Sequence, residues 1–124
     1  AYKRQLDADV AFRIKRARSC LDAGIRMSFN SDRPVVLGDP WCGIAAAVKR
    51  PEGFDQGENV TLEEAVRLYT EGGADANDDS ETMGAISVGR LADFQVYRSG
   101  IDLFGKPSPD EVYLSGEISF GKGS

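Results

Sequence analysis

The residue with the clearest capacity for chemistry is Asp32, which lies in the run Phe-Asn-Ser-Asp-Arg-Pro over residues 29–34. An ionised aspartate can ligate a divalent cation, and it can also accept a proton from water and pass it to a leaving group. The 124 residues include no histidine, which is the commonest metal ligand of proteins. The chain therefore offers a carboxylate for catalysis or metal binding, but it has no histidine ligands to complete a metal site around it.

The elements predicted on the N-terminal side of Asp32 place it just after a strand. Apolar residues recur at helical spacing over residues 9–21, and Gly24 is suited to end that helix. Apolar and polar residues then alternate over 25–29, which predicts a strand. In α/β barrels the catalytic residues follow the carboxyl ends of the strands. Taken alone, an aspartate close to a proline is more typical of a turn or helix cap.

Two further helices are predicted after Asp32. The Asp-Pro pair at 39–40 supplies an N-cap and a first helical position, and this helix is expected to run to Lys49 and Arg50. Thr61 and Glu64 have the spacing of a capping box and open an amphipathic helix over 61–73. The glycine pair at 72–73 is expected to end it, and the acidic stretch that follows is expected to be an exposed connection.

The periodicity changes to two after residue 83. A strand is predicted over 91–96, and a hairpin or two short strands are predicted over 112–120 around Ser115-Gly116. A further turn is predicted over 106–109. We therefore expect residues 1–83 to form a helical α/β part and residues 84–124 to form a β part. Neither part is self-sufficient, because one strand with three helices makes no barrel and three strands leave open edges.

Six segments together resemble the amidohydrolase superfamily, most closely amidohydrolase family 3, the YtcJ-like metal-dependent hydrolases. They occur in the family's order from about residue 21 to residue 96. The motif Gly-x-Ile-x-x-Gly-x-x-Ala-Asp, which begins at Gly84, is moderately specific, and the joint spacing of the segments carries the resemblance. The matching segments are residues 22–25, 31–34, 39–41, 46–50, 62–70 and 84–94.

The resemblance implies an α/β fold, namely the C-terminal part of a (β/α)8 TIM-like barrel with its helix, last strand and following helices. This part, residues 1–83, is expected to join the strands of a small composite β-sandwich over 84–124. The implied parent protein is a hydrolase that acts on carbon–nitrogen bonds of non-peptide or cyclic amides. It is expected to hold one or two divalent metals, commonly zinc, and to act on a small-molecule amide substrate.

Asp32 matches the aspartate that follows the eighth barrel strand of the family, so the resemblance assigns it both catalytic and metal-ligating roles. The family's histidine ligands have no counterpart among the 124 residues. We therefore expect this segment to be inactive by itself and to bind no metal stably, with the other ligands encoded upstream. A first residue Ala1, rather than methionine, suits a segment of a longer chain.

Arg33 and Trp41 are the weaker candidates, both for binding the substrate. Arg33 could orient a substrate carboxylate, although surface ion pairs are the commoner role of such a residue. Trp41 could stack on a substrate, although a packing anchor for its helix is the commoner role. The acidic run over 75–81 lacks the glycine and terminal glutamate of an EF-hand calcium loop, which favours a solvated connection.

Composition and charge limit the kinds of partner that the chain is expected to bind. A hydrophobic fraction of 41%, a charged fraction of 28% and a net charge of −5 are those of an ordinary soluble protein and disfavour binding to nucleic acid. No apolar run approaches the roughly 20 residues that a membrane span needs. Cys20 and Cys42 form no Cys-x-x-Cys pair, so reduced thiols in a cytoplasmic protein are expected, with a disulfide as the other reading.

Two hypotheses from other functional classes remain open. One is a non-enzymatic regulatory or binding module derived from the amidohydrolase fold, since some relatives carry the name exoenzyme regulatory protein and residues 13–18 are basic. The other is self-association of the isolated segment, which would cover its strand edges and exposed helix faces.

Overall fold

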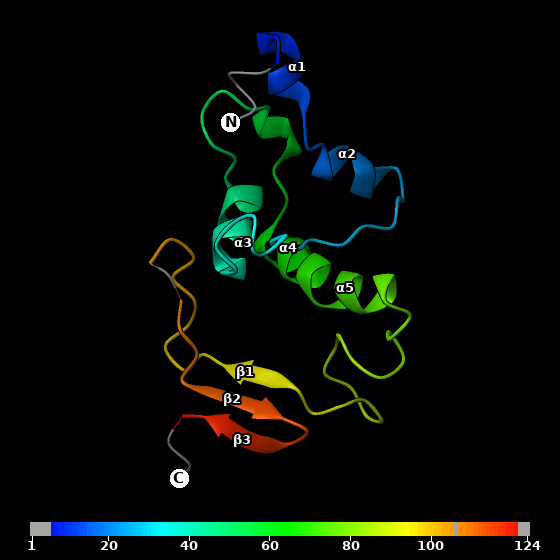
Figure 1. Ribbon diagram of the computed structural model, residues 1–124, viewed down its shortest axis with the longest axis vertical. Helices are drawn as coiled ribbons and strands as arrows, with labels where there is room; N and C mark the ends of the chain where they lie inside the picture. Colours follow the sequence, from blue (N-terminus) through cyan, green and yellow to red (C-terminus); the bar gives the residue numbers. More distant parts are fainter. Residues whose placement is uncertain (1–5, 106, 122–124) are drawn as a thin grey trace.

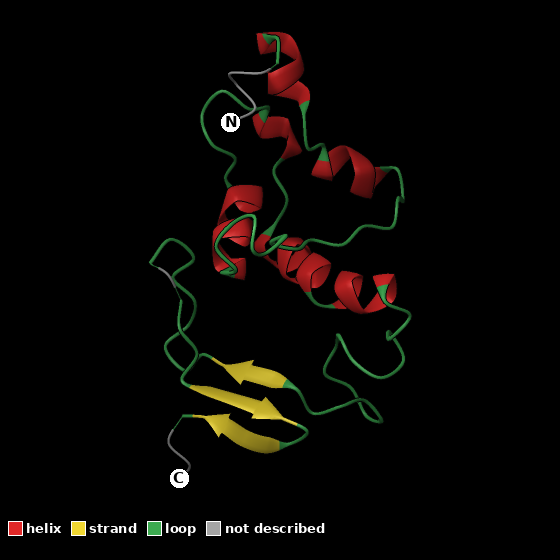
Figure 2. Ribbon diagram, in the orientation of Figure 1, coloured by secondary structure: helices red, strands yellow, loops and turns green. Residues whose placement is uncertain are grey.

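The computed structural model describes residues 6–105 and 107–121 as a group of short helices followed by a three-stranded sheet (Figure 1). Figure 2 shows the helices and the strands gathered at opposite ends of the long axis. Among the described residues, no helix combines the length and apolar character that crossing a membrane requires. The elements are α1 (Ala8–Arg13), α2 (Ala17–Asp22), α3 (Pro40–Val48), the 3-10 helix η2 (Gln56–Glu58), α4 (Leu62–Tyr69), α5 (Glu71–Ala76), β1 (Phe94–Val96), β2 (Glu111–Leu114) and β3 (Glu117–Phe120).

The single helix predicted over residues 9–21 is wrong, because the chain forms α1 and α2 with a break between them. Ile14 is extended, with ψ of 160°, and Lys15 has a left-handed backbone with φ of 56°. The guanidinium of Arg50 donates hydrogen bonds to the carbonyl oxygens of Ile14 (2.7 Å) and Lys15 (2.5 Å). These two carbonyls would be occupied inside a continuous helix. A distant arginine therefore stabilises the break, and the local periodicity gives no sign of it.

The strand predicted over residues 25–29 is also not formed, so the described chain contains no barrel strand. Residues 25–32 have no strand partner, and the N–H of Phe29 instead donates to the carbonyl oxygen of Leu68 in α4 at 2.9 Å. A parallel strand requires a neighbouring strand for its ladder of hydrogen bonds. The three strands of the described residues pair only with one another, which leaves this segment without one.

Helices α3 and α4 begin where their caps predict. Asp39 accepts a hydrogen bond from the backbone N–H of Trp41 at 2.9 Å, with Pro40 in the first helical turn. The helix ends at Val48, slightly before the predicted end. The capping box is confirmed, since Thr61 accepts from the N–H of Glu64 and the Glu64 carboxylate accepts from the N–H of Thr61.

The glycine pair at 72–73 does not end a helix. Helix α4 ends at Tyr69, and both glycines lie inside α5, which also contains the first residues of the predicted acidic connection. A Cβ atom at Gly72 would lie 2.5 Å from the carbonyl oxygen of Met27. Glycine at this position therefore allows α5 to pack directly on the backbone of the segment that leads to Asp32.

The C-terminal hairpin is confirmed. The three strands form an antiparallel sheet in the order β1-β2-β3, with Phe94 opposite Tyr113. Ser115 and Gly116 at the turn both have positive φ, of 53° and 81°, as in a type I′ turn. The carboxylate of Asp93 accepts a hydrogen bond from the N–H of Ser115 at 2.7 Å, which ties the hairpin to the start of β1. The turn predicted over 106–109 includes Lys106, which lies outside the described residues.

The hydrophobic core is small and lies between α3 and α4. Its buried centre is Ile44, Val60 and Ala65, and partly buried residues of α2, α3 and α4 pack around it. In the described parts of the chain, 16 large apolar side chains are exposed. A core of this size does not cover them, so the helices and the sheet present apolar faces to their surroundings.

Candidate functional site

Asp32 stands in a tight turn between the segment held against α4 and the start of α3. Its φ is 52°, a left-handed conformation that side-chain-bearing residues rarely adopt. Its N–H donates to the side-chain oxygen of Asn30 at 2.9 Å, and its carbonyl oxygen accepts from the N–H of Val35 at 2.8 Å. The peptide bond between Arg33 and Pro34 is cis, as in a type VI turn. The Asp32 residue is exposed, so its carboxylate is open to solvent or to a reactant.

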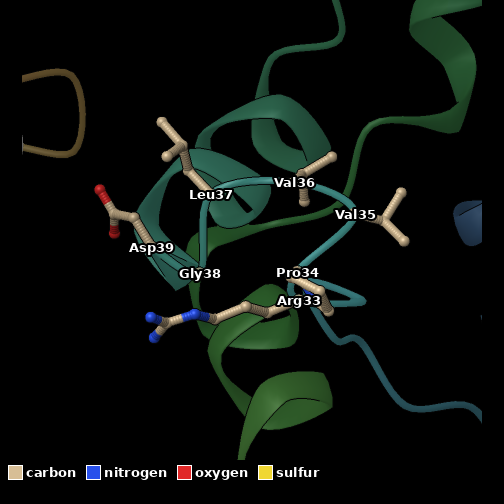
Figure 3. Close-up of a pocket in the computed structure, with 7 residues that line it drawn as sticks. All are labelled: Arg33, Pro34, Val35, Val36, Leu37, Gly38 and Asp39. Atoms are coloured by element: carbon tan, nitrogen blue, oxygen red, sulfur yellow. The ribbon is translucent and has the colours of Figure 1, made fainter.

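The loop after Asp32 bounds an open hollow of about 750 Å³ (Figure 3). Val35, Val36 and Leu37 are 74%, 57% and 85% exposed, and Figure 3 shows their side chains directed away from the loop. The side chain of Arg33 runs close beneath Gly38, where an added Cβ would lie 2.8 Å from Arg33 Cδ. The structure thus places a guanidinium and three aliphatic side chains within five residues of Asp32.

Trp41 is directed toward the sheet. Its indole N–H donates to the hydroxyl of Tyr97 at 3.2 Å, and the two rings meet edge to face with centroids 5.6 Å apart. This is the geometry of a packing anchor, which is the commoner role of a helix tryptophan. Trp41 follows Asp32 in the same loop-to-helix segment. Among the described residues its side chain contacts Tyr97, and no interaction joins it to Asp32.

Tyr69 in α4 lies beside the first turns of α3. Burial raises the pKa of its phenol, and the nearby Cys42 and Asp39 raise it further. An added Cβ at Gly43 would lie 2.0 Å from the Tyr69 hydroxyl oxygen, so the ring packs directly on the α3 backbone. Its other side meets Phe29 edge to face, with centroids 5.7 Å apart. Tyr69 is therefore a neutral packing residue that fixes the segment before Asp32 against both helices.

Comparison with known proteins places the chain in a family. Residues 2–120 match the model of the Amidohydrolase family, Amidohydro_3. The chain belongs to amidohydrolase family 3. The match extends over nearly all of the sequence, which confirms the resemblance drawn from the short segments around Asp32 and Gly84.

Individual relatives of this amidohydrolase chain agree with the family match. It is 35% identical over 83 residues to the N-substituted formamide deformylase of Arthrobacter pascens, covering 64% of this chain and 15% of that protein. It is 34% identical over 86 residues to YtcJ of Bacillus subtilis (strain 168), whose name refers to an amidohydrolase, covering 64% and 16%.

A solved structure also resembles the amidohydrolase chain. An uncharacterised metal-dependent hydrolase from Pyrococcus furiosus is 34% identical and superimposes with a TM-score of 0.56, covering 68% of this chain and 17% of that one. The chain thus spans less than a fifth of the length of the relatives it matches.

Membership in this family implies a divalent metal in the complete protein, and the described residues of the amidohydrolase chain do not fit one by themselves. They contain no group of three or more histidine, cysteine, aspartate or glutamate side chains placed to hold a metal ion. A catalytic zinc ion takes about three protein ligands. No such group of donors surrounds Asp32 among the described residues.

Sequence reasoning singled out Asp32 in the amidohydrolase chain but missed Asn30. The signal was present, because an asparagine whose side chain accepts the backbone N–H two residues later is a common turn former. The alternation of apolar and polar residues before Asn30 hid it, since that alternation predicted a strand and not a turn. The contact became visible only once the left-handed conformation of Asp32 was known.

Proposed function

We propose that this chain forms part of a hydrolase for carbon–nitrogen bonds in small amides, and that Asp32 is the catalytic carboxylate it contributes. The observation that carries the proposal is the placement of Asp32, an exposed aspartate whose backbone N–H and C=O are both held by the surrounding turn. Family membership and the formamide deformylase relative support the reaction class.

The chemistry assigned to Asp32 is proton transfer. Hydrolysis of an amide requires removal of a proton from the attacking water and delivery of a proton to the leaving nitrogen. A single carboxylate can do both in turn, first as general base and then as general acid. An asparagine would keep the shape of the side chain but has no group that can take up the proton. The substitution of Asp32 by asparagine therefore separates chemistry from packing.

The surroundings of Asp32 provide contacts for a substrate. The guanidinium of Arg33 suits an anionic or carbonyl oxygen, and the aliphatic side chains of Val35, Val36 and Leu37 suit an apolar substituent. Trp41 takes the weaker role in substrate binding, because its indole N–H is already bound to Tyr97.

The proposed architecture follows the family. Residues 1–83 form the end of a barrel whose other strands supply the partners that residues 25–29 lack, and residues 84–124 form strands of a composite β-sandwich. The metal ligands other than Asp32 come from outside the described residues. On this proposal the 124-residue chain has no hydrolase activity by itself.

The test uses the complete product of the gene that encodes this chain. Amine release is measured from a panel of N-substituted formamides, other small amides and cyclic amides, for the unmodified protein and for Asp32→Asn. We expect Asp32→Asn to lower kcat by about a hundredfold or more, the usual contribution of a general acid–base group. The control is Asp22→Asn, because Asp22 lies at the end of α2 and its exposed side chain pairs with Arg18. Unchanged kcat in Asp32→Asn would overturn the proposal.

A second arm tests the isolated chain. The 124-residue polypeptide is incubated with zinc and the same panel, and we expect no metal-dependent amine release. Turnover that is lost in Asp32→Asn would support the role of Asp32 and contradict the inactivity of the chain.

A further inference from the structure

The backbone of Asp32 has a left-handed φ of 52°, a conformation that is strained for most L residues and that aspartate adopts more readily than most. Hydrogen bonds to its backbone groups add to the stability of this conformation. Changing this residue to an extended conformation would rotate the Cα–Cβ bond relative to the chain on either side. The direction of the Asp32 carboxylate therefore depends on what maintains the left-handed turn.

Two hydrogen bonds maintain it, and they use both backbone groups of Asp32. The N–H donates to Asn30 Oδ1 at 2.9 Å, and the carbonyl oxygen accepts from Val35 N–H at 2.8 Å. The second bond closes the turn that follows Asp32. The first comes from a side chain, so a substitution at position 30 can remove the acceptor without removing a backbone group of the turn.

Asn30 is itself anchored to a helix. The preceding residue, Phe29, donates its N–H to the carbonyl oxygen of Leu68 at 2.9 Å and packs its ring against Tyr69. The chain of contacts runs from α4 through Phe29 to Asn30 and then to the backbone of Asp32. The turn is thereby positioned relative to a regular element, which is what a catalytic side chain on a loop requires.

We infer that Asn30 is a positioning residue that sets the direction of the Asp32 carboxylate, an inference that rests on the proposed function. The role needs an acceptor oxygen on a short side chain two residues before Asp32. Asparagine and aspartate both provide one, and alanine provides none. Substitution of Asn30 by alanine leaves Asp32 in the protein but removes a support of its backbone conformation.

The kinetic test compares Asn30→Ala and Asn30→Asp in the complete gene product, with Asn77→Ala as the control for loss of an exposed asparagine. Misplacing a catalytic group by about 1 Å can lower the rate by about a hundredfold. We expect Asn30→Ala to lower kcat by about tenfold to a hundredfold with KM within about twofold, and Asn30→Asp to recover most of the loss. A purely structural role would lower the yield or the melting temperature while leaving kcat per folded molecule unchanged.

The outcomes separate this inference from the proposed function. If Asp32→Asn abolishes turnover while Asn30→Ala leaves kcat unchanged, the positioning role of Asn30 is overturned and the role of Asp32 stands. If Asp32→Asn leaves turnover unchanged, the proposed function fails and the positioning role fails with it.

A structural readout on the 124-residue chain complements the kinetics. Amide NMR of Asn30→Ala is expected to show faster hydrogen exchange at Asp32 and a changed N–H to Hα coupling, which reports its φ angle. Asn30→Asp is expected to restore both. An Asp32 coupling and exchange rate that are identical in the unmodified chain and in Asn30→Ala would overturn the inference.

Discussion

The indole N–H of Trp41 and the hydroxyl of Tyr97 are joined by a 3.2 Å hydrogen bond, and their rings meet edge to face. Tyr97 in turn donates its hydroxyl hydrogen to Gln95 at 2.7 Å. Trp41 lies in the first turn of α3, whereas Gln95 and Tyr97 lie in and just after β1. This short relay connects the helix that follows the Asp32 loop to the C-terminal sheet.

Substituting Tyr97 by phenylalanine tests that connection. The ring stays, but the acceptor for the Trp41 N–H and the donor to Gln95 are lost, so we expect the free energy of unfolding to fall by about 0.5–1.5 kcal/mol. Trp41 is the only tryptophan, so its fluorescence reports the site during urea unfolding. Tyr113→Phe is the control, because that hydroxyl bonds to Glu111 within β2. Equal tryptophan emission in Tyr97→Phe and the unmodified chain would contradict the relay.

The two adjacent glycines of α5 form a matched pair for a second prediction. Gly72→Ala places a Cβ 2.5 Å from the carbonyl oxygen of Met27, whereas Gly73→Ala meets no atom within 4 Å. We expect Gly72→Ala to lower the free energy of unfolding by about 1–3 kcal/mol, as overpacking does. Gly73→Ala is expected to raise it by about 0.5–1 kcal/mol, because alanine loses less backbone freedom in a helix.

Chemical denaturation of both variants measures the difference directly. Destabilisation by Gly73→Ala as large as that by Gly72→Ala would show that the contact with Met27 is not what requires glycine. Because the segment of Met27 leads to Asp32, the complete gene product carrying Gly72→Ala also reports whether this packing matters for activity.

Glu58 provides a prediction about acid stability. Its side chain is only 6% exposed. Burial alone would raise the pKa of its carboxyl group, but hydrogen bonds from the side chain and backbone of Ser19 and from Arg16 outweigh burial and lower the pKa below its ordinary value of 4.5. A carboxyl whose pKa is lower in the folded chain takes up a proton more readily when unfolded. Its contribution to stability is therefore complete above the ordinary value and is lost as the pH falls below it.

The expected result is a free energy of unfolding that decreases from about pH 5 to about pH 3, and a shallower decrease in Glu58→Gln. Urea unfolding at a series of pH values measures both slopes. Glu63→Gln is the control, because the Glu63 side chain is 78% exposed and pairs with the exposed Arg67. A slope in Glu58→Gln as steep as in the unmodified chain would contradict the assigned role.

Sequence-based predictions were more accurate where neighbouring residues determine the structure than where distant residues determine it. The Asp39 cap, the Thr61–Glu64 box and the Ser115-Gly116 turn were all predicted correctly, because each is formed by residues within a few positions of one another. Such signals need no knowledge of the rest of the fold.

The errors arose where a distant residue decides the conformation. The break near Lys15 is stabilised by Arg50, and Gly72 is explained by its approach to Met27. The strand predicted before Asp32 needs partner strands that the described chain does not contain. The helix, the strand and the helix end were each predicted from a local pattern, whereas the contacts of Arg50 with Lys15 and of Gly72 with Met27 join residues more than thirty positions apart.

At the candidate site, too, one residue was predicted from the sequence and another was not. The residue type and the order of the motifs selected Asp32, and its catalytic role stays a prediction. The contribution of Asn30 was not predicted, because it depends on the left-handed backbone of Asp32, which no residue pattern specified.

The metal affinity of the isolated chain is the last prediction, and it follows from counting donors. Zinc sites use three or four protein ligands, and the described residues bring together no such group around Asp32. The thiol of Cys42 donates to the carboxylate of Asp39 at 3.5 Å, so zinc that bound weakly to this pair would do so independently of Asp32. We expect calorimetric titration with zinc to show no saturable binding that Asp32→Asn removes, and any weak heat to disappear in Cys42→Ser. One-to-one binding that requires Asp32 would contradict the proposal that the other ligands come from outside the described residues.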